Sequence, residues 1–266
     1  MPTRQAARLA RRGGSHPKRC RSVFFGIMYH MHNNIVIVIP AYEPESSLTD
    51  LVRSIRAEFS QIIVVDDGSS RADGIFADVS GIEGVTLLKH EHNKGKGAAL
   101  KTAFAEVLKR FPSADGVVTV DADGQHLLPD IISVAESTAK NRDRFTLGVR
   151  GFDGDVPLRS RFGNAWSRWT FFLLTGTMVY DTQTGLRGMP MKFLQPLCDM
   201  PGNRYEYESR MLVAMARMKQ KPVQIKIKTV YLEGNRTSHF NPIRDSLRIQ
   251  ATLLAARLSR KTILPS

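Results

Sequence analysis

The chain has 266 residues, enough for one large α/β domain, and its mean hydropathy of −0.21 excludes a protein with many membrane spans. The net charge of +13 is unevenly distributed, because residues 1–34 hold seven basic residues and no acidic one. Cys20 and Cys198 lack the spacing of metal ligands or redox pairs, which favours a reduced, cytosolic protein.

Residues 1–34 are predicted to form a disordered basic extension, because the regular pattern of apolar runs begins only at Ile35. Such an extension could also come from an upstream start codon, with Met28 or Met31 as the true first residue. A basic segment can also bind nucleic acid or an anionic membrane, but no recognition motif supports nucleic acid as a partner. The apolar segment 23–28 is too short for a signal peptide, and the run 169–180 is too short to span a membrane.

Apolar, β-branched runs then alternate with segments of helical periodicity. Strands are expected over residues 35–39, 62–65, 85–88, 117–120 and 145–149. Helices are expected over residues 48–59, 73–79, 98–111 and 131–140. This order predicts an α/β fold with a mostly parallel central sheet and helices on both faces. Right-handed crossovers place the carboxyl ends of such strands at one edge, so the loops 40–46, 66–72, 121–128 and 150–160 should face one crevice.

The second half of the chain is less regular. Helices are expected over residues 161–174 and 205–218, and an edge strand over 223–230. The segment 242–260 has apolar residues at helical spacing and a basic opposite face, typical of a helix that lies on a membrane or docks on its own domain. We therefore divide the chain into the extension 1–34, a folded domain 35–240 and a basic amphipathic helix within 241–266.

Two carboxylates, Asp121 and Asp123, follow the expected strand 117–120 directly. Open α/β sheets bind ligands beyond the carboxyl ends of their strands. With the amide of Gln125, these carboxylates supply the hard oxygen ligands that suit Mg²⁺ or Mn²⁺, which keeps open positions for phosphate oxygens. An isolated Asp-x-Asp can equally be a solvated acidic turn.

Polar motifs end or follow three other strands. Pro40-Ala41-Tyr42 ends the first strand, and Val65-Asp66-Asp67 ends the second. The Asp67 carboxylate can accept hydrogen bonds from a base or a ribose, while Asp66 is equally suited to cap the following turn. The glycine- and lysine-rich loop 93–97 opens a helix and could cradle phosphate through Lys94 or Lys96.

In this order and spacing, the four motifs resemble those of the family-2 glycosyltransferases. The resemblance extends over about residues 35–250 and is strongest to the polyprenyl-phosphate and dolichyl-phosphate sugar transferases. It implies a Rossmann-like nucleotide-sugar-binding fold of the GT-A type, with 35–240 as its catalytic domain. Two departures stand out: Glu43-Pro44 follows Tyr42 where the family has Asn-Glu, and His239 replaces a lysine after Arg236. The second departure argues against GDP-mannose and for a bacterial branch.

The resemblance assigns roles to individual residues. Those expected to bind the nucleotide sugar are Pro40, Tyr42, Glu43, Val65, Asp67, Asp121, Ala122, Asp123 and Arg150. The metal ligands implied are Asp121, Asp123 and Gln125, and the residues closest to the reaction are Asp121, Asp123, Arg150 and Arg187. The acceptor phosphate would meet Arg161, Arg187, Arg236 and His239, although a structural salt bridge is an equal alternative for Arg187.

The expected function is inverting, metal-assisted transfer of a hexose from a UDP- or GDP-sugar to a polyprenyl phosphate at the inner face of the cell membrane. A phosphate monoester is largely dianionic at neutral pH, with a second pKa of about 6, and needs no base. A hydroxyl acceptor would need one, and Asp181, Glu206 and Glu208 are the candidates. The other alternative is an inactive nucleotide-sugar-binding subunit of a membrane assembly. Membrane contact would be direct or through a separate membrane-spanning subunit.

Overall fold

The computed structural model describes residues 34–151 and 158–228, and within the second range the side chains from residue 165 onward. Nearly all of the predicted basic extension and the whole predicted helix over 242–260 lie outside these ranges. Arg236 and His239 lie outside them too, and Arg161 is described by its backbone alone.

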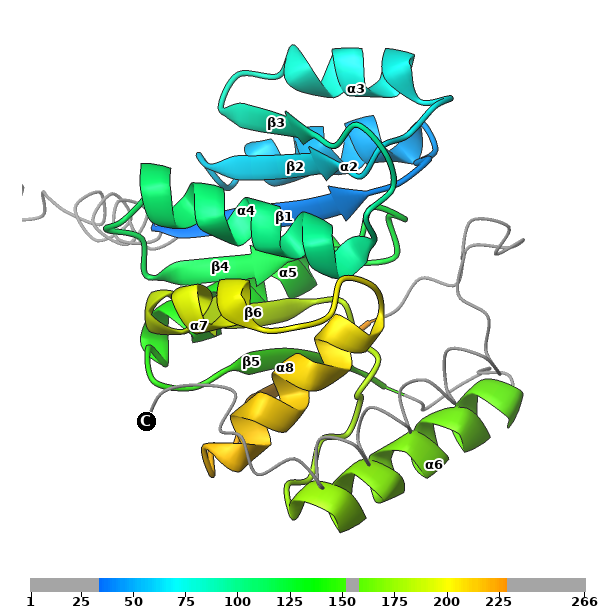
Figure 1. Cartoon of the computed structure of the whole chain (residues 1–266), viewed down its shortest axis with the longest axis vertical. Helices are drawn as coiled ribbons and strands as arrows, with labels where there is room; N and C mark the ends of the chain where they lie inside the picture. Colours follow the sequence, from blue (N-terminus) through cyan, green and yellow to red (C-terminus); the bar gives the residue numbers. More distant parts are fainter. Residues whose placement is uncertain (1–33, 152–157, 229–266) are drawn as a thin grey trace, which may run out of the picture.

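A seven-stranded sheet with the order β3-β2-β1-β4-β6-β5-β7 forms the centre of the molecule (Figure 1). The strands are β1 (Ile35–Ala41), β2 (Ile62–Asp66), β3 (Val85–Lys89), β4 (Gly116–Thr119), β5 (Thr146–Arg150), β6 (Arg187–Pro190) and β7 (Val223–Ile227). All neighbouring strands are parallel except β6, which runs antiparallel to both β4 and β5. The predicted mostly parallel sheet is confirmed.

Helices cover both faces of this sheet. They are α2 (Ser47–Arg56), α3 (Asp73–Ser80), α4 (Lys96–Arg110), α5 (Leu128–Lys140), α6 (Leu158–Thr175), α7 (Leu194–Asp199) and α8 (Glu206–Arg217), with a 3₁₀ turn at Met191–Phe193. Alternate residues of β1 enter two separate cores: Val36 and Val38 pack with α4, α7 and α8, whereas Ile35 and Ile37 pack with α2, α3 and α5. A strand buried on both faces explains the unbroken β-branched run at the start of the domain.

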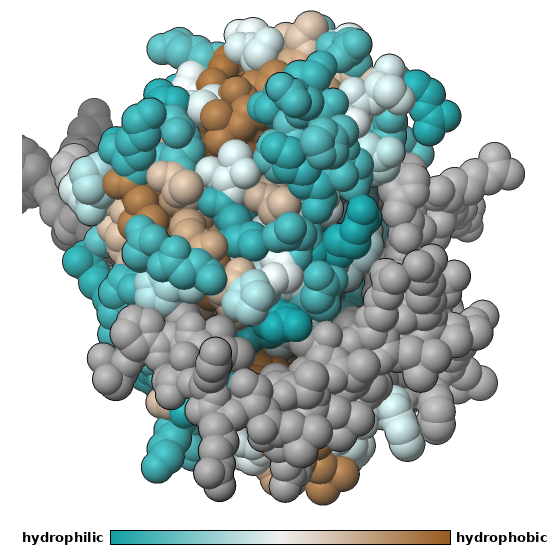
Figure 2. All heavy atoms as spheres, viewed as in Figure 1, coloured by the Kyte–Doolittle hydropathy of each residue, from teal (hydrophilic) through white to brown (hydrophobic). Residues whose placement is uncertain are grey.

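The surface over α3, α4 and α7 is mixed. Hydrophilic residues predominate among the described residues seen from this side, and smaller hydrophobic areas lie between them (Figure 2). Within the two described ranges, no helix combines the length and the apolar character needed to cross a bilayer.

The six strands expected from the sequence are all present, and 223–230 is indeed an edge strand, formed by β7 next to β5. β6 and α7 were not predicted. Arg187-Gly-Met-Pro190 is short, begins with a charge and ends with proline, so it shows no strand periodicity. Its strand conformation comes from pairing with β4 on one side and β5 on the other.

Gly188 lets β6 approach α5 closely. A Cβ atom at this position would overlap the Oγ1 atom of Thr138, a fully buried residue of α5. We predict that Gly188→Ala lowers the free energy of unfolding by about 1–3 kcal/mol, measured by urea denaturation, because the core must shift to admit the methyl group.

Gly74→Ala is the matched control, since a Cβ atom there meets nothing within 4 Å and alanine favours the helix. Thr138→Ala removes the overlapping hydroxyl, so the double variant should lose less stability than the sum of the two single changes. Strict additivity would contradict the close packing of β6 against α5.

Candidate active site

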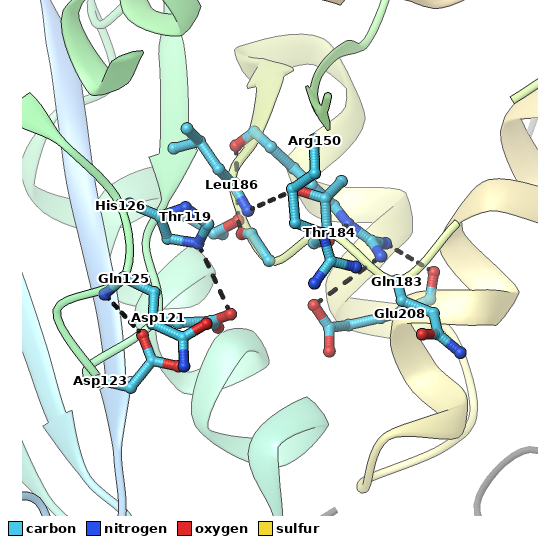
Figure 3. Close-up of polar contacts among 12 residues, drawn as sticks. Thr119, Asp121, Asp123, Gln125, His126, Arg150, Gln183, Thr184, Leu186 and Glu208 are labelled. Carbon is cyan, nitrogen blue, oxygen red and sulfur yellow. Dashed lines mark hydrogen bonds and ion pairs between the residues drawn. The ribbon is translucent and has the colours of Figure 1, made fainter. Parts of the chain in front are cut away.

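A cavity of about 700 Å³ opens at the carboxyl edge of β1, β4 and β5. Its wall includes residues of the loops after these strands and after β2, as the crossover rule predicts. The segments 93–99 and 182–187 and the start of α8 complete the lining. Figure 3 shows Asp121, Asp123 and Gln125 together on one side, opposite Arg150 and Glu208.

Most residues that the sequence nominated for the site do line this cavity: Pro40, Tyr42, Glu43, Asp67, Asp121, Ala122, Asp123, Gln125, Arg150 and Arg187. Val65 differs, because it is fully buried in the core and its side chain cannot reach a ligand in the cavity. The cavity is also lined by Lys96, which the sequence suggested as a phosphate contact, and by Glu208, which it suggested as a base for a hydroxyl acceptor.

The Lys96 ammonium group bridges two carboxylates of the cavity wall. Its Nζ atom lies 2.7 Å from Oδ1 of Asp121 and 2.9 Å from Oε2 of Glu208. Burial opposes the charged form of Lys96, but both carboxylates outweigh it and raise the pKa of the amine. Burial likewise opposes ionisation of Asp121, yet Lys96 and His126 hold the pKa of this carboxyl far below its usual range. Asp121 is thus held ionised.

Asp123 has the opposite electrostatic environment. Burial and the negative charge of Asp121 raise the pKa of the Asp123 carboxyl. Its Oδ1 atom accepts a hydrogen bond of 3.0 Å from the backbone N–H of Gln125, which orients the carboxylate. A cation between two adjacent carboxylates would relieve this repulsion, so the donor set fits a hard divalent metal ion.

The described residues contain no group of three or more His, Cys, Asp or Glu side chains arranged to hold a metal. Two carboxylates and an amide oxygen leave coordination positions that substrate phosphates would have to fill, the usual arrangement for Mg²⁺ at phosphate sites. The chemistry of Asp121, Asp123 and Gln125 therefore suits a metal shared with a bound diphosphate.

His126 is a residue of the site that sequence reasoning missed. It is buried, and its Nε2 atom lies 3.7 Å from Oδ2 of Asp121 without a hydrogen-bond partner. Its position directly after the Asp-x-Asp-Gly-Gln segment was the available signal.

Asp67 holds the glycine-rich loop in place. Its Oδ1 atom lies 2.7 Å from Nδ1 of His90 and accepts a 3.0 Å hydrogen bond from the Lys94 backbone, while Oδ2 accepts one of 2.8 Å from the Gly95 backbone. The residue is 2% exposed, and these three contacts use most of the acceptor positions of its carboxylate. A contact of Asp67 with a base or ribose stays a prediction. Asp66 caps the turn as expected, accepting from the Ser69 N–H at 2.8 Å.

Glu43 joins the loop after β1 to the loop after β2. Its carboxylate accepts hydrogen bonds from the backbone N–H groups of Ser70 (2.8 Å) and Arg71 (3.2 Å). Its backbone is left-handed, with φ of 46°, a conformation that non-glycine residues adopt only when the surroundings compensate. The hydrogen bond from Ser70 lowers the pKa of the Glu43 carboxyl.

Two arginines of the cavity wall form hydrogen bonds with other residues of the chain. Arg150 forms a bidentate pair with fully buried Asp181, with contacts of 2.6 Å (Nε to Oδ2) and 3.0 Å (Nη2 to Oδ1). Arg187 donates to the carbonyl groups of Thr184 and Glu208 at 2.7 and 2.8 Å. Its Nη2 atom also lies 3.9 Å from Oε1 of Glu208, and the residue is 2% exposed, which agrees with the structural salt bridge considered as the alternative for Arg187.

The three carboxylates proposed as bases for a hydroxyl acceptor lie in different places. Asp181 is buried against Arg150, and Glu206 accepts from the backbone N–H groups of Asn203 and Arg204 at the start of α8. Of the three, Glu208 alone lines the cavity, where it is paired with Lys96.

Comparisons with known proteins agree with this geometry. Residues 36–192 match the family model described as glycosyl transferase family 2. A UDP-N-acetylglucosamine–dolichyl-phosphate N-acetylglucosaminyltransferase of the archaeon Methanococcus voltae is 31% identical over 221 residues, covering 75% of this chain and 86% of that protein. A polyprenol monophosphomannose synthase of Mycolicibacterium smegmatis is 26% identical over 174 residues, covering 61% and 63%. The resemblance found in the motifs is confirmed, although similar relatives are not restricted to bacteria.

The fold is shared with a solved structure. Glucosyl-3-phosphoglycerate synthase of Mycobacterium tuberculosis, crystallised with Mn²⁺, UDP and glucosyl-3-phosphoglycerate, superimposes with a TM-score of 0.63 at 18% identity. The match covers 96% of this chain and 87% of that one. The predicted GT-A type of fold is thereby confirmed.

We predict that Lys96→Met lowers the free energy of unfolding by about 1–3 kcal/mol, because two carboxylates lose their shared counter-charge. The side chains of Lys96 and Asp121 are 20% and 29% exposed, which keeps the loss below that of a completely buried pair. Urea denaturation checks this, with exposed Lys94→Met as the control. An equal effect of both substitutions would contradict the bridging role of Lys96.

Glu43 provides a test by pH. A carboxyl whose pKa is lowered in the folded state stabilises the protein above its unfolded pKa of about 4.3 and loses this contribution as the pH falls further. The stability difference between the wild type and Glu43→Gln should therefore be largest near neutral pH and shrink below about pH 4. Glu58→Gln is the matched control, because it removes an exposed carboxylate of the same type at another position.

Proposed function

Because this chain belongs to glycosyl transferase family 2 and is a glycosyltransferase, we propose that it transfers a hexose from a UDP- or GDP-linked sugar to a polyprenyl phosphate. One observation carries the proposal: a single cavity is lined by the acidic residues Asp121 and Asp123 and by the basic residues Arg150 and Arg187. Carboxylates bind the metal ion that accompanies a diphosphate, and guanidinium groups bind phosphate. The M. voltae relative is named for transfer to dolichyl phosphate, which supports the acceptor class.

On the donor side, Pro40 and Tyr42 are proposed to hold the nucleobase, since Tyr42 is 40% exposed at the cavity wall. Asp67 and Glu43 would act indirectly, by fixing the loops that line this part of the cavity. Ala122 lies between the two carboxylates and lines the cavity as well.

Asp121, Asp123 and Gln125 would hold Mg²⁺ or Mn²⁺ together with the donor diphosphate. Such a metal, when bound, stabilises the negative charge that develops on the departing nucleoside diphosphate. The Lys96 ammonium keeps Asp121 ionised and so keeps the ligand set in its binding form.

In the proposed step, a phosphate oxygen of the acceptor forms a bond to the anomeric carbon while the bond from that carbon to the diphosphate breaks. Attack opposite the leaving group inverts the anomeric configuration. The acceptor dianion carries its own electron pair, so no side chain has to remove a proton. A mechanism without a base agrees with the structure of the cavity, where the Glu208 carboxylate is already paired with Lys96.

Arg161, Arg187, Arg236 and His239 remain proposed contacts of the acceptor phosphate, and Arg187 lines the cavity. The reaction would take place at the inner face of the cell membrane, where the lipid phosphate is embedded. A cytoplasmic, peripheral protein, held directly or by a separate membrane-spanning subunit, would meet the acceptor there.

We predict that Asp123→Asn lowers kcat for transfer of label from nucleotide sugar to polyprenyl phosphate by about 100-fold or more. The metal ion proposed to bind the donor diphosphate would lose an ionised ligand. The assay uses a panel of UDP- and GDP-sugars in detergent, with Mg²⁺ or Mn²⁺ compared with EDTA. Asp143→Asn, at a 70% exposed carboxylate away from the cavity, is the matched control.

The other outcomes separate the alternatives. Transfer only to hydroxyl compounds, abolished by Glu208→Gln, would replace the phosphate acceptor by a hydroxyl acceptor. Nucleotide-sugar binding without transfer to any acceptor would indicate an inactive binding subunit.

A further inference from the structure

The outer face of α6 exposes three large apolar side chains. Trp166, Trp169 and Leu173 are 63%, 52% and 72% exposed. Their spacing of three and four residues places them on one face of the helix, and Tyr180, 50% exposed, follows shortly after the helix ends. Among the side chains described in residues 34–151 and 165–228, one other large hydrophobic residue is exposed, Tyr42 at the cavity. Such a concentration marks a contact surface.

The inner face of α6 is anchored beside the candidate active site. Phe171 is 1% exposed in the core that includes α8, and the Oγ atom of Ser167 lies 2.7 Å from Oγ1 of Thr182. Thr182 lines the cavity. The exposed face therefore belongs to a helix docked through its opposite side, and that helix is attached to the cavity wall. Figure 1 shows α6 at the lower edge of the molecule, next to α8.

The chemistry of this surface fits one partner, an anionic phospholipid bilayer. Tryptophan and tyrosine concentrate at membrane interfaces, where an apolar ring and a polar N–H or O–H group are both satisfied. The 18 residues of α6 include Arg159, Arg161 and Arg168 and no acidic residue, in a chain of net charge +13. Apolar and aromatic residues combined with positive charge are typical of helices that lie on anionic lipid.

We infer that the outer face of α6, formed by Trp166, Trp169 and Leu173, docks on an anionic phospholipid bilayer and brings the active-site cavity to the membrane surface. The functional consequence, delivery of a lipid-linked phosphate to the cavity past α6, rests on the proposed function. The docking of α6 on a bilayer is independent of the proposed function.

The tryptophans make the inference directly testable. The chain contains two tryptophans, and both lie on this face, so the intrinsic fluorescence of the full-length protein reports on α6. Addition of phosphatidylcholine vesicles with 30% phosphatidylglycerol should shift the emission to the blue, and brominated lipid should quench it. Pure phosphatidylcholine vesicles should give a weaker response, because the arginines lose their partners.

Variants assign the contact. Trp166→Ser/Trp169→Ser should reduce co-sedimentation with the anionic vesicles by about tenfold or more. The control, Asp50→Ser/Arg53→Ser, changes two exposed residues three apart on α2 and leaves the net charge unaltered. Undiminished sedimentation of the tryptophan variant would overturn the inference by placing the contact elsewhere, for example on residues 242–260.

Two further fluorescence results would also overturn it: no shift with anionic vesicles, or a shift that grows with protein concentration in the absence of lipid. The second would mean that a second copy of the chain covers α6. Circular dichroism of both double variants checks that each remains folded.

Turnover separates this inference from the proposed function. With a short-chain, water-soluble prenyl phosphate, the tryptophan variant should match the wild type, whereas with polyprenyl phosphate in vesicles it should be about tenfold slower. If the wild type uses neither acceptor, the proposed function fails, and vesicle binding still decides the role of α6.

Discussion

The ion-pair bridge of Asp121, Lys96 and Glu208 is the interaction on which the arrangement of the site depends. The three residues come from the loop after β4, the first position of α4 and the first turn of α8. A carboxylate removed from water is costly unless it is paired, and one ammonium group compensates two of them here. Gly185, two residues before β6, packs directly against the Asp121 carboxylate, since a Cβ atom there would overlap it. The bridge therefore fixes three segments around one charged group.

The acidic residues around the cavity divide into two kinds. Asp67, Glu43 and Asp181 have their oxygens directed at backbone N–H groups or at an arginine, and they hold loops in position. Asp123 also accepts a backbone N–H, that of Gln125, but burial and the neighbouring Asp121 outweigh this contact and raise the pKa of its carboxyl. A carboxylate whose ionised form is disfavoured in this way would be stabilised by a divalent metal ion bound beside it.

A family-2 glycosyltransferase that acts on a lipid phosphate must join a water-soluble donor to an acceptor in a membrane. The cavity at the carboxyl edge of the sheet is proposed to bind the donor, and the exposed face of α6 beside it is proposed to meet the membrane. The Ser167 to Thr182 contact connects the two, so the surface proposed to meet the bilayer is joined directly to the wall of the cavity.

The layers of the fold and the position of the Asp-x-Asp motif follow directly from the order of residues along the chain. Unbroken apolar runs require strands buried on both faces, and parallel strands bring their following loops to one edge. The partners of the charged side chains could be identified only in the folded chain: Asp67 with His90, Arg150 with Asp181, and Lys96 with Glu208. The fold brings these pairs together. It also decided β6, whose four residues become a strand because β4 and β5 lie on either side. Local periodicity records what a segment buries, but an ion pair or an inserted strand depends on which distant segments meet, and that is settled only when the chain packs.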